Sequence, residues 1–86
     1  MQVKHSGRFI GQSKKLPLLI KVKLAHLLVL LEANIYNPLL HTKRLSGEFD
    51  GLYSFRVSRD WRVIFSIEFT GNIRLLEVAH RKDIYR

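Results

Sequence analysis

The feature that most constrains the fold of this chain is the stretch from residue 52 to the C-terminus. It holds three runs that are rich in β-branched and aromatic residues, and turn sequences at residues 58–60 and 70–72 separate them. Such runs favour β-strands, and short polar or glycine-containing turns between them are typical of an antiparallel meander. The second half of the chain is therefore predicted to form three antiparallel strands.

The pattern within these runs predicts one apolar and one cationic face of the sheet. Successive side chains of a strand point to opposite faces. Val63 and Phe65 therefore share one face, whereas Arg62 and Ile64 share the other. Arg56 takes the same kind of outward position on the preceding run. Such a sheet needs a helical layer on its apolar face, and an anionic partner or water on the other.

The first half of the chain predicts a short strand followed by two helices. Residues 2–5 suit an edge strand, and Ser6 suits the N-cap of a first helix that runs to residues 14–15. Pro17 suits the first turn of a second helix that ends near Asn34. The order β-α-α-β-β-β indicates an α+β fold. We expect two N-terminal helices packed on one face of a small, mainly antiparallel, twisted sheet.

The second helix is apolar over more than half of its circumference. One stripe at helical spacing is predicted to lie on the sheet. Leu19, Val22, Val29 and Leu30 lie off this stripe. They could contact the first helix, which we expect for residues near Pro17, or they could form a docking surface for a partner helix. The stripe on the sheet consists of Ile20, Leu24, Leu27, Leu28, Leu31 and Ile35.

Length and composition predict one domain, residues 1–86, in a reducing compartment such as the cytoplasm. There is no cysteine, and no secretory signal is visible at the N-terminus. Lys21, Lys23 and Glu32 interrupt the apolar second helix, so a membrane span is not expected. The formal net charge of +8 is large for a domain of this size and favours a polyanionic partner.

Three arginines on the predicted strands are candidates for binding phosphate. Arg56 and Arg62 should lie opposite one another across the first hairpin, where two like charges are unfavourable unless an anion lies between them. Arg81 follows the last strand. Guanidinium groups bind phosphate oxygens in a bidentate manner and keep their charge at neutral pH. Each arginine could instead form an ion pair with a carboxylate. The available carboxylates are those of Asp60, Glu68 and Glu77.

Four segments in combination resemble the RelE/ParE superfamily of toxins from bacterial and archaeal toxin–antitoxin systems. The resemblance implies a RelE-like, ribosome-dependent endoribonuclease (an mRNA interferase) that cleaves mRNA in the ribosomal A site and needs no cofactor or metal. It also implies an acidic, partly disordered cognate antitoxin as partner, besides the ribosome and mRNA. The segments are Leu45-Ser-Gly, Tyr53-Ser-Phe-Arg, Asp60-Trp-Arg-Val-Ile-Phe and Val78-Ala-His-Arg-Lys-Asp-Ile-Tyr.

The resemblance also assigns roles to particular residues. Arg56, Arg62 and Arg81 match basic catalytic positions, and Tyr85 matches a C-terminal aromatic position. Arginine cannot act as a general base. That role is open between His80, Tyr85, Lys43 and His41, although His80 shares its strand parity with Leu76 and Val78 and suits a half-buried place beside the core. The expected RNA-binding residues are Lys43, Arg44, Arg59 and Trp61, and the expected antitoxin-binding residues are Val22, Val29 and Leu30.

One departure from the family pattern keeps other functions open. Some members carry a lysine two residues before the Arg56 position, where this chain has Ser54. A degenerate toxin that binds its antitoxin without cleaving RNA is therefore one alternative. Another is a ParE-like toxin that inhibits DNA gyrase by protein contact, because it would share the fold. A simple RNA-binding module is a third. Trp61 could stack on a base or pack at the edge of the core.

Overall fold

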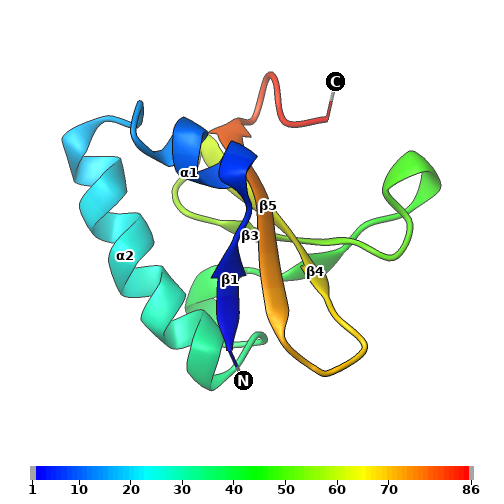
Figure 1. The fold of residues 1–86 in the computed structure, drawn as a ribbon. Helices are drawn as coiled ribbons and strands as arrows, with labels where there is room; N and C mark the ends of the chain where they lie inside the picture. The colour runs from blue at the N-terminus through cyan, green and yellow to red at the C-terminus, as the bar shows by residue number, and fades with distance from the viewer. Residues whose placement is uncertain (1, 86) are drawn as a thin grey trace.

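Two helices cover one face of a five-stranded sheet (Figure 1). The structure is a computed structural model and describes residues 2–85. Two short 3-10 turns, η1 and η2, lie between the second helix and the meander. In chain order the elements are β1 (Val3–His5), α1 (Gly7–Ser13), α2 (Leu18–Ala33), η1 (Pro38–Leu40), β2 (Lys43–Arg44), η2 (Gly47–Phe49), β3 (Tyr53–Arg56), β4 (Trp61–Ile67) and β5 (Ile73–His80).

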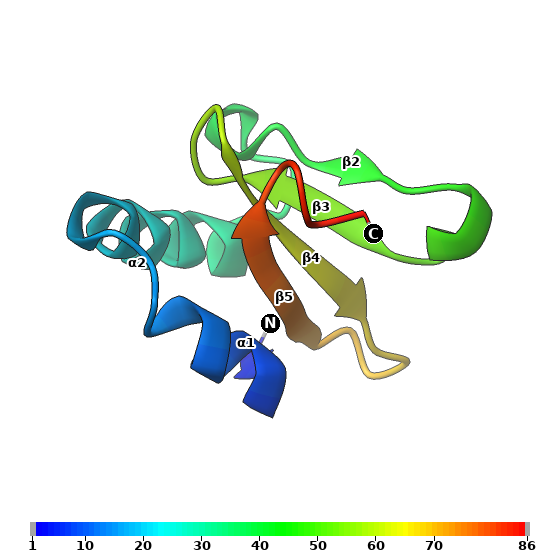
Figure 2. The ribbon, with the colours of Figure 1, turned by 90° about the horizontal axis from the view of Figure 1, so that it is seen from above.

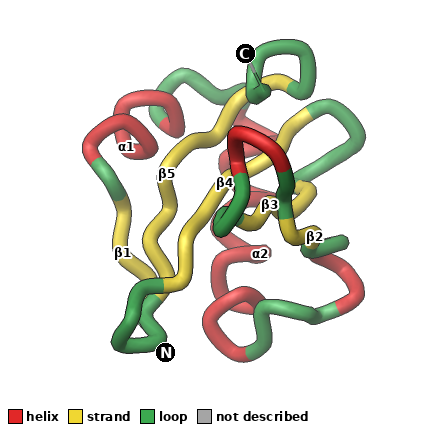
Figure 3. Tube along the Cα trace, turned by 90° about the vertical axis from the view of Figure 1, so that its right-hand side faces the viewer, coloured by secondary structure: helices red, strands yellow, loops and turns green. Residues whose placement is uncertain are grey.

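The strands lie in the order β1-β5-β4-β3-β2 across the sheet (Figure 3). β3, β4 and β5 form the predicted antiparallel meander, and β1 is the predicted edge strand, which pairs in parallel with β5. The short strand β2 was not predicted. Lys43 and Arg44 were expected in a connecting loop, but they pair with Ser54 and Tyr53 of β3. β2 therefore adds a cationic edge to the meander.

The helix boundaries follow the sequence signals. The Ser6 hydroxyl accepts a hydrogen bond of 3.1 Å from the backbone N–H of Phe9, which caps α1 as predicted. Pro17 precedes the first residue of α2, and Asn34 follows its last residue. Within residues 2–85, no helix has the length and apolar character needed to cross a membrane.

The main core lies between the helices and the sheet. Leu24, Leu27 and Leu31 of the predicted α2 stripe are buried, and they share one apolar cluster with Phe55 and Phe65 of the meander. The prediction that residues near Pro17 contact α1 was wrong for the first turn of α2. Leu18 and Leu19 are 75% and 82% exposed. Most apolar residues of α2 outside the predicted stripe, namely Leu19, Val22 and Val29, therefore face solvent.

The second sheet face is partly covered, where only solvent or an anion was expected. Ile64, Leu45 and Ile84 are buried together in a smaller apolar cluster on this face. Figure 2 shows how the chain after β5 turns back over the sheet, which brings Ile84 to this cluster. A β-bulge in β5 also places Leu76 in the second cluster while Val78 lies in the main core, so the predicted shared parity of these two residues was wrong.

Candidate active site

A cavity of about 250 Å³ opens where β2, β3, β4 and the C-terminal segment meet. Its lining is polar and cationic, and no acidic side chain contributes to it. Five of the candidate functional residues meet here, among them the candidate general base His41, together with two further residues of β3. The lining residues are His41, Lys43, Ser54, Phe55, Arg56, Arg62 and Tyr85. This is the concentration of positive charge that the sequence pattern predicted.

Arg56 and Arg62 are direct cross-strand partners, as predicted. Arg62 Nη1 donates hydrogen bonds to the carbonyl oxygens of Ser58, at 2.8 Å, and Arg59, at 3.0 Å, which fixes this guanidinium against the β3–β4 turn. The pKa of Arg62 is lowered, first by loss of water around it and then by the charge of Arg56. Arginine nevertheless stays protonated at neutral pH. An anion in the cavity would relieve this repulsion.

Arg56 differs from Arg62 in its surroundings. Its side chain is exposed, and it makes no hydrogen bond or ion pair with any of the residues that the structure describes. Its charge is thus free to act on a ligand, whereas part of the hydrogen-bonding capacity of Arg62 is used by the turn. The two guanidinium groups therefore combine one fixed and one adjustable donor at the same site.

Arg81, a predicted catalytic residue, is not among the residues that line this cavity, and it contacts the β3–β4 turn. Its backbone N–H donates to the Asp60 carbonyl oxygen at 2.7 Å, and its Nε lies 3.4 Å from Asp60 Oδ1. One of the alternative ion pairs considered from the sequence is therefore formed. The pair is about half exposed, so water screens it. The charge of Arg81 still contributes to the lowered pKa of Arg62.

Lys43 lies beside position 54, where this chain departs from the pattern of the family that it resembles. Lys43 of β2 is the cross-strand partner of Ser54, and both residues line the cavity. The neighbouring strand therefore places a lysine beside Ser54, the position at which some members of the resembled family carry a lysine. Arg44, the next residue of β2, is exposed but does not line the cavity. The sequence could not reveal this pairing because two residues do not identify a strand.

Tyr85 reaches the cavity because the preceding residue is anchored. Ile84 is 2% exposed and belongs to the second apolar cluster, whereas Tyr85 is 45% exposed. The ring of Phe49 meets the Tyr85 ring edge-on, with 5.6 Å between centroids and an interplanar angle of 74°. Such aromatic pairs stabilise a defined ring orientation. Phe49 was not singled out from the sequence, where it stands alone in a turn-rich stretch.

Replacing Ile84 with Ala is expected to release the C-terminal segment from the sheet. The loss of a buried isoleucine should lower the free energy of unfolding by about 2–4 kcal/mol. Nuclear Overhauser contacts between the rings of Tyr85 and Phe49 should disappear, because they depend on this anchor. Ile10→Ala, at a side chain that is 41% exposed, is the matched control and should change stability little. Ring contacts that persist in Ile84→Ala would contradict the anchoring role.

His41 is held over the cavity by an uncommon backbone conformation. Its φ of 50° and ψ of 45° lie in the left-handed region, which non-glycine residues adopt infrequently. Leu40 on one side is fully buried, and the hydroxyl of Thr42 on the other donates to the Ile35 carbonyl oxygen. The Asn37 side chain accepts a hydrogen bond of 2.9 Å from Leu39 N–H and caps η1. These contacts fix the direction in which the histidine leaves the backbone.

Two predicted functional residues lie elsewhere. The rings of His80 and Trp61 meet edge-on at a centroid distance of 5.4 Å, and both line a separate cavity beside α1. Trp61 packs against the main core, and His80 Nδ1 accepts a hydrogen bond of 3.2 Å from Lys82 N–H. The half-buried position expected for His80 is confirmed. The cavity with the arginines therefore contains neither His80 nor Trp61.

The remaining predicted residues are dispersed. Arg59 is exposed in the β3–β4 turn and contributes its carbonyl oxygen to Arg62. Val22 and Val29 of α2 are 62% and 67% exposed, whereas Leu30 is half-buried and packs against the main core. The three α2 residues therefore do not form one surface.

Among residues 2–85, no group of His, Asp and Glu side chains could hold a metal ion.

The fold is shared with known toxin structures. No protein-family profile and no curated protein matches the chain. YafQ from E. coli strain BL21(DE3) superposes with a TM-score of 0.79 at 19% identity, over 99% of this chain and 98% of YafQ. A YoeB/ParE toxin from Agrobacterium tumefaciens gives a TM-score of 0.80 at 13% identity, over 94% of this chain and 99% of that toxin.

A third similar structure is a RelB–RelE antitoxin–toxin complex from Methanococcus jannaschii. Its matching chain gives a TM-score of 0.79 at 22% identity, over 95% of this chain and 94% of that one. At these identities the superpositions establish the fold. The chain therefore has the RelE/ParE-like toxin fold, with two helices against a mostly antiparallel five-stranded sheet.

Proposed function

We propose that this protein is the toxin of a type II toxin–antitoxin system and acts as a ribosome-dependent endoribonuclease that cleaves mRNA in the ribosomal A site. The observation that carries this proposal is the cavity on a RelE/ParE-like fold in which Lys43, Arg56, Arg62 and Tyr85 converge without any acidic side chain. A degenerate toxin is less well supported, because Lys43 brings an ammonium group beside Ser54.

The proposed reaction is a transfer within the RNA backbone. The ribose 2′-oxygen attacks the adjacent phosphorus, the bond from phosphorus to the 5′-oxygen breaks, and a 2′,3′-cyclic phosphate and a 5′-hydroxyl result. Negative charge builds on the phosphoryl oxygens in the transition state. Arg56 and Arg62 would stabilise this charge, because donors that are already oriented need no rearrangement during the reaction. Tyr85, which is partly exposed, would stack on a base.

His41 is the residue that we propose to accept the proton of the 2′-hydroxyl. Lys43, Arg56 and Arg62 are cationic side chains and do not suit the role of proton acceptor. The acceptor in this cavity must therefore be His41 or Tyr85. Imidazole is the side chain that ordinarily exchanges protons near neutral pH. The proton taken from the 2′-hydroxyl would later reach the leaving 5′-oxygen through solvent, which completes the proton balance.

Replacing His41 with Asn tests this role without disturbing the backbone, because Asn also tolerates the left-handed region. The rate of cleavage is expected to fall by roughly 10²–10⁴-fold. His26→Asn, on the exposed surface of α2, is the control. A cleavage rate in His41→Asn equal to that of the parent would assign the proton to Tyr85 or solvent.

Primer extension on mRNA in a translating extract tests the function itself. The purified protein is expected to generate discrete new 5′ ends on ribosome-bound message and to leave free message intact. Cleavage of free RNA would remove the ribosome from the proposal, and intact message under both conditions would overturn the nuclease. A gyrase supercoiling assay would then decide whether the protein is a ParE-like inhibitor.

The proposal includes a cognate antitoxin as partner and a cytoplasmic site of action. The matched M. jannaschii structure is described as an antitoxin–toxin complex, which supports a partner of this kind. The formal net charge of +8 favours an acidic antitoxin, since opposite charges accelerate association and disfavour incorrect partners.

A further inference from the structure

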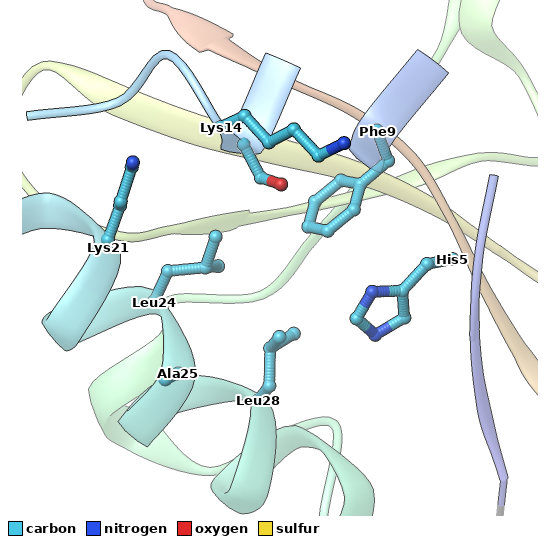
Figure 4. A pocket seen from close by; sticks show the side chains of 8 residues that line it. His5, Phe9, Lys14, Lys21, Leu24, Ala25 and Leu28 are labelled. Atoms are coloured by element: carbon cyan, nitrogen blue, oxygen red, sulfur yellow. The ribbon is translucent and has the colours of Figure 1, made fainter. Parts of the chain in front are cut away.

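A second cavity, of about 300 Å³, lies between α1, α2 and β1 on the helical side of the sheet. Phe9, Leu24 and Leu28 surround its apolar interior, and His5 of β1 lies beside Phe9 (Figure 4). None of its lining residues also lines the candidate active site, so the proposed nuclease reaction makes no use of this cavity. The cavity is therefore open to a ligand other than the RNA substrate.

The apolar wall of this cavity belongs to the folded core. Phe9 and Leu24 are 1% and 5% exposed, and Leu28 packs against the same apolar cluster. The rings of His5 and Phe9 meet edge-on, with 5.2 Å between centroids and an interplanar angle of 81°. Such aromatic pairs stabilise a defined ring orientation. The wall is thus formed before a ligand binds, which lowers the entropic cost of binding.

The charged groups at the rim of this cavity favour an anion. Lys14 lies at the end of α1 and Lys21 in the first turn of α2, so the two ammonium groups come from separate elements (Figure 4). No acidic side chain lines the cavity. The ion pairs found among residues 2–85 use Lys4, Arg8 and Arg81, so neither rim lysine is paired with a carboxylate in this part of the chain.

We propose that this cavity binds a small organic carboxylate with an apolar body, of the size of a medium-chain fatty acid. At roughly 30 Å³ for each group of the size of water, the cavity holds about ten non-hydrogen atoms. The apolar body would lie against Phe9 and Leu24, and the carboxylate would lie between the ammonium groups of Lys14 and Lys21. Apolar walls with a few convergent polar groups are typical of small-molecule sites.

The composition of the cavity favours this ligand over the polyanions that a cationic protein also attracts. Phosphate groups suit the arginines of the candidate active site, where the lining is polar. The hydroxyl groups of a nucleotide would be left unpaired against Phe9 and Leu24, which costs free energy. The outward face of α2, which carries Val22 and Val29, contributes nothing to the lining. The site therefore lies between the elements and not on the exposed face of the helix.

Titration of the full chain with octanoate tests this inference. Octanoate carries a carboxylate on a single hydrocarbon chain, and octyltrimethylammonium carries the opposite charge on the same chain. Below the concentrations at which either compound forms micelles, octanoate should cause saturable chemical-shift changes in NMR spectra at Phe9, Leu24 and Leu28. The cationic compound should bind at least about tenfold more weakly. The melting temperature should rise with the concentration of octanoate, because the site exists only in the folded chain.

Two double variants of equal net charge test the role of the rim lysines. Lys14→Gln with Lys21→Gln should weaken octanoate binding at least about tenfold, since it removes both charged partners of the carboxylate. Lys15→Gln with Lys23→Gln alters neighbouring lysines that do not line the cavity, and it should bind octanoate as the parent does.

Ala25→Phe tests the cavity itself. Ala25 lines the cavity from an exposed position of α2, so the larger ring fills the cavity without overpacking the core. The variant should melt cooperatively and should not bind octanoate. Val22→Phe adds the same ring to an exposed position outside the lining and is the matched control.

Several outcomes would overturn the inference. The absence of saturable binding, or equal binding of octanoate and its cationic counterpart, would exclude a carboxylate site. Chemical-shift changes confined to the candidate active site would place the anion there. Sedimentation of the protein with anionic phospholipid vesicles that persists in Ala25→Phe, without binding of octanoate, would make a membrane surface the partner. None of these experiments measures RNA cleavage, so a negative result leaves the proposed nuclease unaffected.

Discussion

Arg56→Met is expected to reduce cleavage of ribosome-bound message by roughly 10²–10³-fold, the loss that follows removal of one transition-state donor from an enzyme site. The Arg56 side chain is exposed and forms no hydrogen bond or ion pair with residues 2–85, so the folded protein does not need its charge. Its side chain lines the cavity opposite Arg62. The measurement is single-turnover cleavage followed by primer extension.

The same substitution is expected to leave the melting temperature unchanged or slightly higher. Like charges opposite one another on paired strands destabilise a sheet, and the charge of Arg56 contributes to the lowered pKa of Arg62. Loss of activity without loss of stability would identify Arg56 as a residue retained for function. Arg74→Met, at an exposed position of β5 opposite Ser66, is the matched control. A fully active Arg56→Met protein would refute the assignment of this cavity.

Local signals in the sequence determined most of the helix and strand boundaries correctly. Ser6 and Pro17 mark the starts of both helices because capping and proline geometry act within one turn of the chain. The meander followed from alternation and from two turn sequences, and that register also predicted the pairing of Arg56 with Arg62. These features depend on neighbours in sequence or across a tight hairpin.

The features that the sequence did not reveal depend on contacts between distant segments. Strand β2 has two residues and exists because β3 provides a partner. The bulge at Leu76 shifts the alternation of β5 by one residue, which no pattern within β5 indicates. The second cluster joins Leu45, Ile64 and Ile84, residues that are far apart in the chain. The position of Tyr85 depends on that cluster.

The sequence therefore predicted the arginines of the candidate site but not which histidine would lie beside them. Arg56 and Arg62 followed from strand periodicity. The sequence left the role of proton acceptor open between His80, Tyr85, Lys43 and His41. The structure places His80 beside Trp61 and places His41 in the cavity, because the left-handed backbone at His41 redirects the chain after η1. A single positive-φ residue has no reliable sequence signature unless it is glycine.

Leu31→Asp is expected to unfold the protein at ordinary temperature. Leu31 has no exposed surface and lies in the main core between α2 and the meander. Truncating a buried leucine costs about 2–5 kcal/mol, and an unpaired buried carboxylate adds several more. The total stability of a domain of this length is roughly 4–13 kcal/mol, so one substitution removes most or all of it. Circular dichroism and urea titration should show no cooperative transition.

Val29→Asp on the same helix separates this effect from a general intolerance of α2 to charge. Val29 is 67% exposed and lies two residues before Leu31, on the side of α2 that faces solvent. The variant should melt cooperatively, with a stability within about 1 kcal/mol of the parent, because its carboxylate stays hydrated. A folded Leu31→Asp protein, or an unfolded Val29→Asp protein, would show that the buried and exposed faces of α2 are assigned incorrectly.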